Sequence, residues 1–352
     1  MNLTDRLLAL LKIPSSTRQE GQLCDFLHER LSRIKEYTLE RVGNSFALCP
    51  RQRESRPLVG LFGHLDTVPG KGNNLVRQED NRIFGLGASD MKSGLAIMWH
   101  LLEEPVVDPA YDLAFVFYDG EEGPYEENGL ISLLEKLKWL KEIDLAFFLE
   151  PSENKLQLGC MGSLHALVTF QGQAAHSACP WRGENAIHKA GDLLNQLAVQ
   201  VPKDVHMGEL VYREVVSATL AHGGNARNVV PDTFTLNINF RFAPGRSLVS
   251  AQEFVRNLVG DRAKIEFVDL SPAGPLPQRN RVLQEFTRKC PVEVAAKQGW
   301  TDVARLAVAG IPAVNFGPGE GSQAHQPNES VAIDLLREGD LLFRRFFSSE
   351  KE

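Results

Sequence analysis

Three short, continuous runs of apolar residues place the strongest constraint on the fold of this chain. The runs cover residues 57–63, 113–118 and 145–150, and helical patterns lie between them at residues 93–104 and 129–140. Runs of this length suit strands buried on both faces, as in a mainly parallel sheet with helices on either side. The alternation of strands and helices therefore predicts an α/β fold with a doubly wound mixed sheet.

The middle of the chain has a different pattern, with clean two-residue alternation in several segments. The expected order is strand 163–172, helix 184–198, strands 215–223 and 233–242, helix 247–260 with Ser247 as N-cap, and strand 263–270. This βαββαβ order is typical of ferredoxin-like units. Because 352 residues are many for one core, we expect two domains. Residues 1–161 and 275–352 would form one domain, and residues 162–274 an inserted α+β domain.

Composition excludes several classes of protein. The net charge of −7 argues against a nucleic-acid surface, and we find no apolar run of the roughly 18–20 residues that would span a bilayer. The N-terminal residues 1–16 fit an amphipathic helix better than a signal peptide, since charged residues interrupt the apolar pattern. Five scattered cysteines without a CxxC motif are typical of reduced thiols, so we expect a cytoplasmic protein.

Acidic residues and a histidine follow the predicted strands or begin the helices. The stretches are GHLDT (63–67), GASDMKSG (87–94), YDGEEG (118–123) and LEPSE (149–153). Because sites in open α/β sheets form at the carboxyl ends of the strands, we expect these stretches to meet in one crevice. A further candidate is His325, in the Gly-rich loop 316–329.

Each stretch by itself has a plainer interpretation. His64 could be a core histidine, Asp90 could be only a helix N-cap, and Glu121 with Glu122 could be a solvated acidic face. Only their convergence would distinguish a site from these alternatives.

Imidazole and carboxylate ligands without thiolates suit zinc, manganese or cobalt. One catalytic zinc normally uses three protein ligands, so this larger set would suit two ions that share a bridging carboxylate, with another carboxylate left as general base. A phosphate-binding loop is disfavoured because Met91 stands where the Walker pattern has glycine, and MGSLH (161–165) is not a serine nucleophile elbow.

These motifs resemble the zinc-dependent amidohydrolases and exopeptidases that include carboxypeptidase G, aminoacylase and acetylornithine deacetylase. The resemblance covers essentially the whole chain and is carried most specifically by GHLDTVP, GLGASDMKSG and YDGEEG, in that order. It implies two zinc ions per subunit, with Co²⁺ or Mn²⁺ as substitutes, and a bridging Asp90. It also implies that Glu121 is the general base and that Asp66 orients the His64 imidazole. The remaining ligands that it implies are His64 and Glu150 for one zinc, and Glu122 and His325 for the other.

The same resemblance implies that residues 1–161 and 275–352 form the catalytic domain and that residues 162–274 form a lid and dimerisation domain. It also implies roles for residues in the second half of the chain. His176 would reach the partner's active site in a homodimer and stabilise an oxyanion. Arg241 would contact a substrate carboxylate, for which a bidentate guanidinium is suited. The other substrate-binding residues that it implies are Asn225, Arg227 and Asn228 in one loop, and Thr301 with Asp302 in another.

Within the family, the segments CMGSLHALVT, HSACPWRGENAIHK and INFRFAPGRS most resemble actinobacterial-type succinyl-diaminopimelate desuccinylases. The resemblance thus implies hydrolysis of N-succinyl-LL-2,6-diaminopimelate, a small anionic N-acyl amino acid, to succinate and LL-2,6-diaminopimelate. A related deacylase such as acetylornithine deacetylase, a metallo-dipeptidase, and a metal-binding homologue without turnover are the alternatives.

Overall fold

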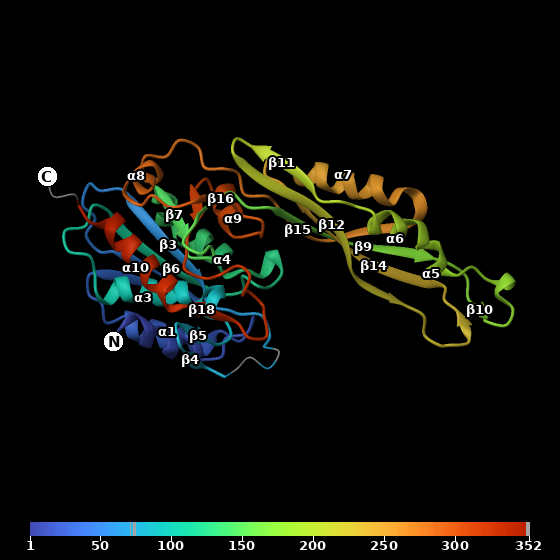
Figure 1. Cartoon of the computed structure of the whole chain (residues 1–352), viewed down its shortest axis with the longest axis horizontal. Coiled ribbons are helices and arrows are strands. Elements are labelled where there is room, and N and C mark those ends of the chain that lie inside the picture. Colours follow the sequence, from blue (N-terminus) through green and yellow to red (C-terminus); the bar gives the residue numbers. More distant parts are fainter. Residues whose placement is uncertain (71, 73–74, 350–352) are drawn as a thin grey trace. The chain divides into compact units, whose positions relative to one another are not determined.

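The chain forms two compact units (Figure 1). The computed structural model describes residues 1–70, 72 and 75–349, so the last three residues of the segment 275–352 lie outside it. The first unit comprises Met1–Gly159, Leu276–Ala295 and Arg305–Glu352, and the second comprises Cys160–Pro275 and Ala296–Ala304. Among the described residues, no helix is long and apolar enough to cross a membrane. The assignment of the units as catalytic domain and lid stays a prediction.

The first unit is built on an eight-stranded mixed sheet. Its central strands β6, β3, β7 and β17 are parallel, whereas β1, β2 and β8 pair antiparallel towards the edges. In sheet order the strands are β1 (Tyr37–Val42), β2 (Ser45–Pro50), β6 (Asp112–Tyr118), β3 (Leu58–His64), β7 (Leu145–Phe148), β17 (Ala313–Asn315), β8 (Leu156–Leu158) and β16 (Val294–Ala296). The predicted α/β class with a mixed sheet is confirmed.

Both faces of the central strand β3 are covered, which explains why all seven of its residues are buried. A Cβ atom on Gly63 would lie 2.7 Å from Leu95 of α3 (Ser93–Glu103). On the opposite face, a Cβ atom on Gly60 would lie 3.0 Å from Ile143. The other helices of this unit include α1 (Leu3–Leu11), α2 (Gly21–Leu31), α4 (Gly129–Lys136), α8 (Arg281–Lys289) and α10 (Ile333–Phe347), and α9 (Val303–Val308) precedes β17.

A small sheet beside the main one connects two distant parts of the first unit. Its strands are β4 (Arg77–Glu79), β5 (Arg82–Phe84) and β18 (Ser330–Ala332), and β18 pairs with β5. The segment that follows β5 is therefore held next to the segment that precedes β18.

The second unit is an antiparallel five-stranded sheet with helices on one face. Its strands, in sheet order, are β11 (Lys203–Met207), β12 (Leu210–Gly223), β14 (Thr233–Phe242), β9 (Gly162–Gln171) and β15 (Lys264–Ser271). Helices α5 (Ala186–Lys189), α6 (Gly191–Ala198) and α7 (Leu248–Val259) pack on apolar residues of β9 and β14 such as Leu164, Phe170 and Phe240. A separate ribbon joins β10 (Ala175–His176) to β13 (Val229–Val230).

Several elements differ from the prediction. The helix expected at residues 184–198 is divided into α5 and α6, and the helix expected at 129–140 ends at Lys136 before a short 3₁₀ turn. The hairpin β1–β2 and strand β11 were not predicted, because β1 and β11 are half-exposed edge strands without a long apolar run. Ser247 is the N-cap of α7, as expected, and accepts a hydrogen bond from the Ser250 N–H at 3.2 Å.

Close packing of α3 on the end of β7 predicts that alanine at position 94 of this helix destabilises the fold. A Cβ atom on Gly94 would lie 2.6 Å from both the Cβ atom and the carbonyl oxygen of Leu149. Gly94→Ala should therefore lower the free energy of unfolding by about 1–3 kcal/mol in urea titrations, although alanine favours helices. The control Gly191→Ala, at a helical position with no atom within 4 Å, should cost nothing. Equal stability of both variants would contradict the packing.

Candidate metal centre

Adjacent parallel strands bring the predicted site residues to one edge of the first unit's sheet. His64 is the last residue of β3, Glu121 and Glu122 follow β6, and Glu150 follows β7. Since β6, β3 and β7 are neighbours, their carboxyl ends meet. The convergence expected from the sequence is therefore present in the structure.

Asp90 lies between two histidines that come from distant parts of the chain. Its Oδ1 atom is 3.2 Å from Nε2 of His64, and its Oδ2 atom is 3.6 Å from Nε2 of His325. Asp90 is not the N-cap of α3, because that position belongs to Lys92. Each carboxylate oxygen of Asp90 thus faces a different imidazole, which is the arrangement that a bridging ligand requires.

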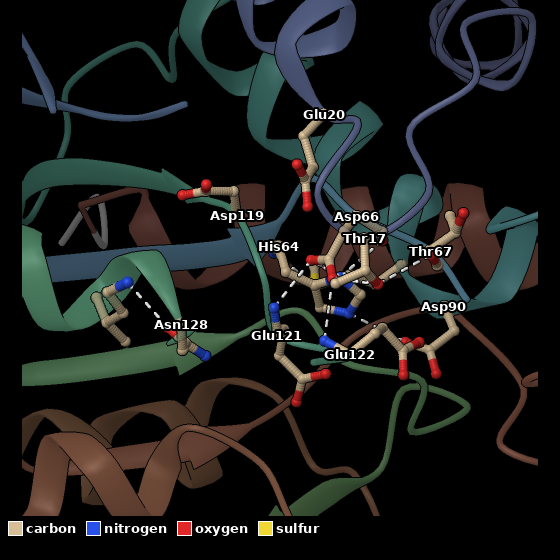
Figure 2. A network of polar contacts seen from close by, with 12 residues as sticks. Thr17, Glu20, His64, Asp66, Thr67, Asp90, Asp119, Glu121, Glu122 and Asn128 are labelled. Atoms are coloured by element: carbon tan, nitrogen blue, oxygen red, sulfur yellow. Dashed lines mark hydrogen bonds and ion pairs between the residues drawn. The ribbon is translucent and has the colours of Figure 1, made fainter. Parts of the chain in front are cut away.

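The other acidic side chains complete two groups around Asp90. Oε1 of Glu122 is 2.9 Å from Nε2 of His325, and Oε1 of Glu150 is 3.8 Å from Nε2 of His64. Figure 2 shows the Glu122 and Asp90 carboxylates beside each other. Potential ligand atoms lie within 4.8 Å of one another in the groups His64–Asp90–Glu150, His64–Glu121–Glu122 and Asp90–Glu122–His325.

The charge of this cluster fits divalent cations. Its four carboxylates carry −4 when ionised, its two imidazoles are neutral as metal ligands, and two divalent cations carry +4. Carboxylate and imidazole donors are the ligands expected for catalytic zinc, cobalt or manganese. The residues present therefore fit a metal centre, and two ions match their charge.

Proton affinities in the cluster show how strongly it attracts positive charge. Burial disfavours the charged imidazole of His64, but the neighbouring Asp66 and Asp90 raise its pKa well above the ordinary value. The hydrogen bond with Glu122 raises the pKa of His325 to about 9, and burial raises the pKa of Glu122.

Asp66 fixes the turn that carries the two adjacent glutamates. Its Oδ1 atom accepts a hydrogen bond from the Glu121 N–H at 3.0 Å, and its Oδ2 atom accepts one from the Glu122 N–H at 3.0 Å (Figure 2). The Thr17 hydroxyl also donates to Oδ2, at 3.1 Å. The fully buried Asp66 carboxylate thus sets the main-chain position of both glutamates.

The contact between Asp66 and His64 involves the main chain. Nδ1 of His64 donates to the Asp66 carbonyl oxygen at 2.9 Å, while the nearest Asp66 carboxylate oxygen is 3.5 Å away. This bond leaves Nε2 of His64 directed at Asp90. Asp66 thus contacts the imidazole mainly through its carbonyl oxygen, while its carboxylate accepts hydrogen bonds from the N–H groups of Glu121 and Glu122.

Thr17 and Glu329 are site residues that the sequence reasoning missed. Thr17 lies in a polar stretch after α1, and its contact with Asp66 has no sequence signature. Glu329 ends the HQPNE stretch that contains His325, so its position near a predicted ligand was the available signal.

The remaining predicted residues belong to the second unit. His176 is exposed on β10, next to the exposed loop of Asn225, Arg227 and Asn228, and the Ser177 N–H donates to the Asn228 carbonyl oxygen at 2.9 Å. This ribbon brings four of the predicted substrate-contacting residues together. Their roles stay predictions.

Arg241 and Thr301 lie elsewhere in the second unit. Arg241 is half-buried on β14, where its Nε atom donates to Oδ1 of Asn239 at 3.1 Å. Thr301 is buried, and its hydroxyl has no hydrogen-bond partner among the described residues. The neighbouring Asp302 is also buried.

The fold and the cluster together define an α/β protein with a candidate two-metal centre, a kind of centre that many hydrolases use. The chain belongs to the peptidase family M20/M25/M40, whose family model matches residues 60–349.

Relatives and solved structures agree with this assignment over almost the whole chain. A Mycobacterium tuberculosis protein provisionally named succinyl-diaminopimelate desuccinylase DapE is 41% identical over 94% of this chain and 95% of its own. The Corynebacterium glutamicum succinyl-diaminopimelate desuccinylase is 34% identical over 96% of this chain and 94% of its own. A Staphylococcus aureus tripeptidase has the same fold, with a TM-score of 0.78 at 21% identity over 98% of this chain and 96% of its own.

The Asp66 contacts predict that this carboxylate controls metal binding without being a ligand. Asp66→Asn keeps the size of the side chain but replaces one acceptor oxygen with a donor that faces an N–H group. Metal affinity should fall roughly 10- to 100-fold in competition titrations with a chelator. Thr17→Val removes only the third contact of Asp66, together with a 3.3 Å bond to the Thr67 carbonyl oxygen, and should cause a smaller loss. Unchanged affinity in Asp66→Asn would refute this role.

Proposed function

We propose that this chain is a di-zinc amide hydrolase that converts N-succinyl-LL-2,6-diaminopimelate to succinate and LL-2,6-diaminopimelate. The observation that best supports a two-metal hydrolase is the position of Asp90, whose two carboxylate oxygens face His64 and His325. The names of the M. tuberculosis and C. glutamicum relatives support the substrate. A related deacylase, such as acetylornithine deacetylase, or a metallo-dipeptidase is the second candidate, since the tripeptidase shares the fold.

The cluster would hold two zinc ions on either side of Asp90. His64 and Glu150 lie on one side of this carboxylate, and Glu122 and His325 lie on the other. Two such ions supply Lewis-acid polarisation of the scissile carbonyl and lower the pKa of the attacking water. Cobalt or manganese, which accept the same donor atoms, would substitute.

Glu121 is the proposed general base. Its carboxylate lies within reach of His64 and Glu122, and its main chain is fixed by Asp66. The Glu121 carboxylate takes a proton from the water as its oxygen bonds to the carbonyl carbon. Glu121 then delivers this proton to the nitrogen as the C–N bond breaks, so that the nitrogen leaves as a neutral amine and not as an amide anion. With Glu121 as the base, Glu122, which is hydrogen-bonded to His325, remains as a metal ligand.

A small anionic substrate needs local positive charge in a chain of net charge −7. The ions of the centre supply part of this charge, and Arg241 would supply a bidentate contact for a substrate carboxylate. His176 would donate to the oxyanion that develops on the scissile carbonyl.

The separation of His176 and Arg241 within the second unit supports a homodimer. The ribbon that carries His176 joins the Thr233 end of β14, while Arg241 lies near the other end. Eight residues of strand separate Thr233 from Arg241, about 26 Å at the usual rise. The proposed substrate is no longer than about four extended residues, about 14 Å. We therefore propose that the His176 and Arg241 side chains that contact one substrate come from different copies.

The second unit has a sheet edge suited to such a dimer. Among the described residues, β11 covers β12 only over Leu210–Glu214, so the outer edge of Val215–Gly223 has no paired strand. This stretch, VVSATLAHG, has no lysine, arginine, aspartate or glutamate, and Leu220 is 58% exposed. The opposite edge, β15, carries Lys264, Glu266 and Asp269, charges of the kind that discourage edge pairing.

The proposed activity is tested by comparing substrates on the zinc-loaded protein. Succinate release from succinyl-diaminopimelate should far exceed acetate release from acetylornithine and hydrolysis of a dipeptide. Glu121→Gln should retain both metals and lose at least about 100-fold in kcat, since general bases contribute roughly 10²–10⁴-fold. Full turnover in Glu121→Gln would rule out the assigned base, and a preference for acetylornithine would favour the second candidate.

The proposed homodimer is tested by charge substitution at the two sheet edges. Leu220→Lys should convert a dimer to monomers in analytical ultracentrifugation, because two copies paired along β12 would place the new charge in the interface. The matched control Val268→Lys changes a residue of β15 that is 50% exposed and should remain dimeric. A monomeric wild-type chain, or dissociation by the control alone, would refute this edge as the interface.

A further inference from the structure

The segment Gly87–Met91, which presents Asp90, has an irregular main chain. Gly87 has a left-handed φ of 81°, and Asp90 and Met91 have non-helical φ/ψ values of −120°/94° and −131°/41°. A Cβ atom on Gly87 would also lie 2.7 Å from Thr67, so the position requires glycine. Irregular backbone offers no regular hydrogen-bond pattern to hold Asp90 in place, so the holding contacts come from elsewhere.

One buried carboxylate supplies three of these contacts. Oε2 of Glu329 accepts a hydrogen bond from the Gly87 N–H at 2.8 Å. Oε1 of Glu329 accepts bonds from the N–H groups of Ser89 and Asp90, each at 2.9 Å. Glu329 is 1% exposed, so these bonds are shielded from water.

Glu329 is itself held on the small sheet of the first unit. It directly precedes β18, which pairs with β5, and its carbonyl oxygen accepts a hydrogen bond from the Gly85 N–H at 3.1 Å. The Ser89 hydroxyl donates to the Ser330 carbonyl oxygen at 2.8 Å. The donor segment and the acceptor carboxylate are thus tied together by a main-chain bond from Gly85 and by a side-chain bond from Ser89.

An ionised carboxylate at this position is energetically unfavourable. Burial and the nearby negative charge of Asp90 disfavour the ionised form of Glu329 and raise its pKa to about 7, although the three N–H donors favour the ionised form. Glutamine would present one acceptor oxygen, and its amide group would point a donor at a remaining N–H. Only a carboxylate can accept on both sides of this turn.

We propose that Glu329 is a positioning residue that fixes the main chain of Asp90, so that the two Asp90 oxygens stay directed at His64 and His325. The inference rests on the two-metal centre of the proposed function. Because Asp90 would contact both ions, loss of Glu329 would weaken both binding steps, whereas loss of a terminal ligand such as Glu150 would weaken mainly one. Partners of metal ligands commonly change affinity by 10- to 100-fold.

The test is a titration of the metal-free full chain with Co²⁺. Calorimetry measures the affinities, and visible absorption records the cobalt spectrum. Glu329→Gln should lower the affinity for both ions by roughly 10- to 100-fold and should alter the cobalt spectrum at saturation. The control Glu214→Gln removes another buried carboxylate, which accepts bonds from the Ala243 N–H and from Arg246 in the second unit. It should leave both affinities and the spectrum unchanged, even if both variants lose stability to urea.

Wild-type affinities and a wild-type cobalt spectrum in Glu329→Gln would overturn the positioning role, since a purely structural residue would change only stability. If Glu329→Gln does not fold, Glu329→Asp serves, because it keeps the charge but is one methylene too short to reach all three donors. Wild-type metal binding in that variant would equally overturn the proposal. Binding of fewer than two Co²⁺ ions by the wild-type chain would instead contradict the two-metal centre itself.

Discussion

The position of the Asp90 carboxylate between His64 and His325 is the interaction on which the rest of the site depends. The two imidazoles come from residues more than 250 positions apart in sequence, and each faces one oxygen of the same side chain. Neither Glu122 nor Glu150 alone would distinguish a metal centre from a cluster of buried acids. With Asp90 shared between them, the candidate ligands form two groups of matching chemistry.

The fold places these groups by using different supports for each ligand. His64 ends a fully buried central strand, and its imidazole is oriented by the Asp66 carbonyl oxygen. Glu121 and Glu122 sit on a turn that the Asp66 carboxylate holds by its N–H groups. Buried carboxylates thus act on the main chain around the centre, where each N–H bond helps to offset the cost of burying the charge.

Much of this arrangement could be predicted because it follows from strand order. Continuous apolar runs identified β3, β6 and β7, and acids at the ends of neighbouring parallel strands must meet. The roles of Thr17 and of the Asp66 carboxylate could not be predicted, because they depend on where main-chain N–H groups point. The β1–β2 hairpin escaped prediction because β1 is half-exposed and has no continuous apolar run. The different roles proposed for Glu121 and Glu122 came only from the family resemblance, since the spacing of the sequence does not distinguish the two residues.

Anomalous diffraction from crystals of the zinc-loaded protein tests the central claim most directly. The account predicts two zinc peaks per chain, roughly 3.5–4 Å apart, on either side of the Asp90 carboxylate. One peak should lie beside His64 and Glu150, and the other beside Glu122 and His325. A single fully occupied peak at saturating zinc, or two peaks that do not share Asp90, would contradict the account.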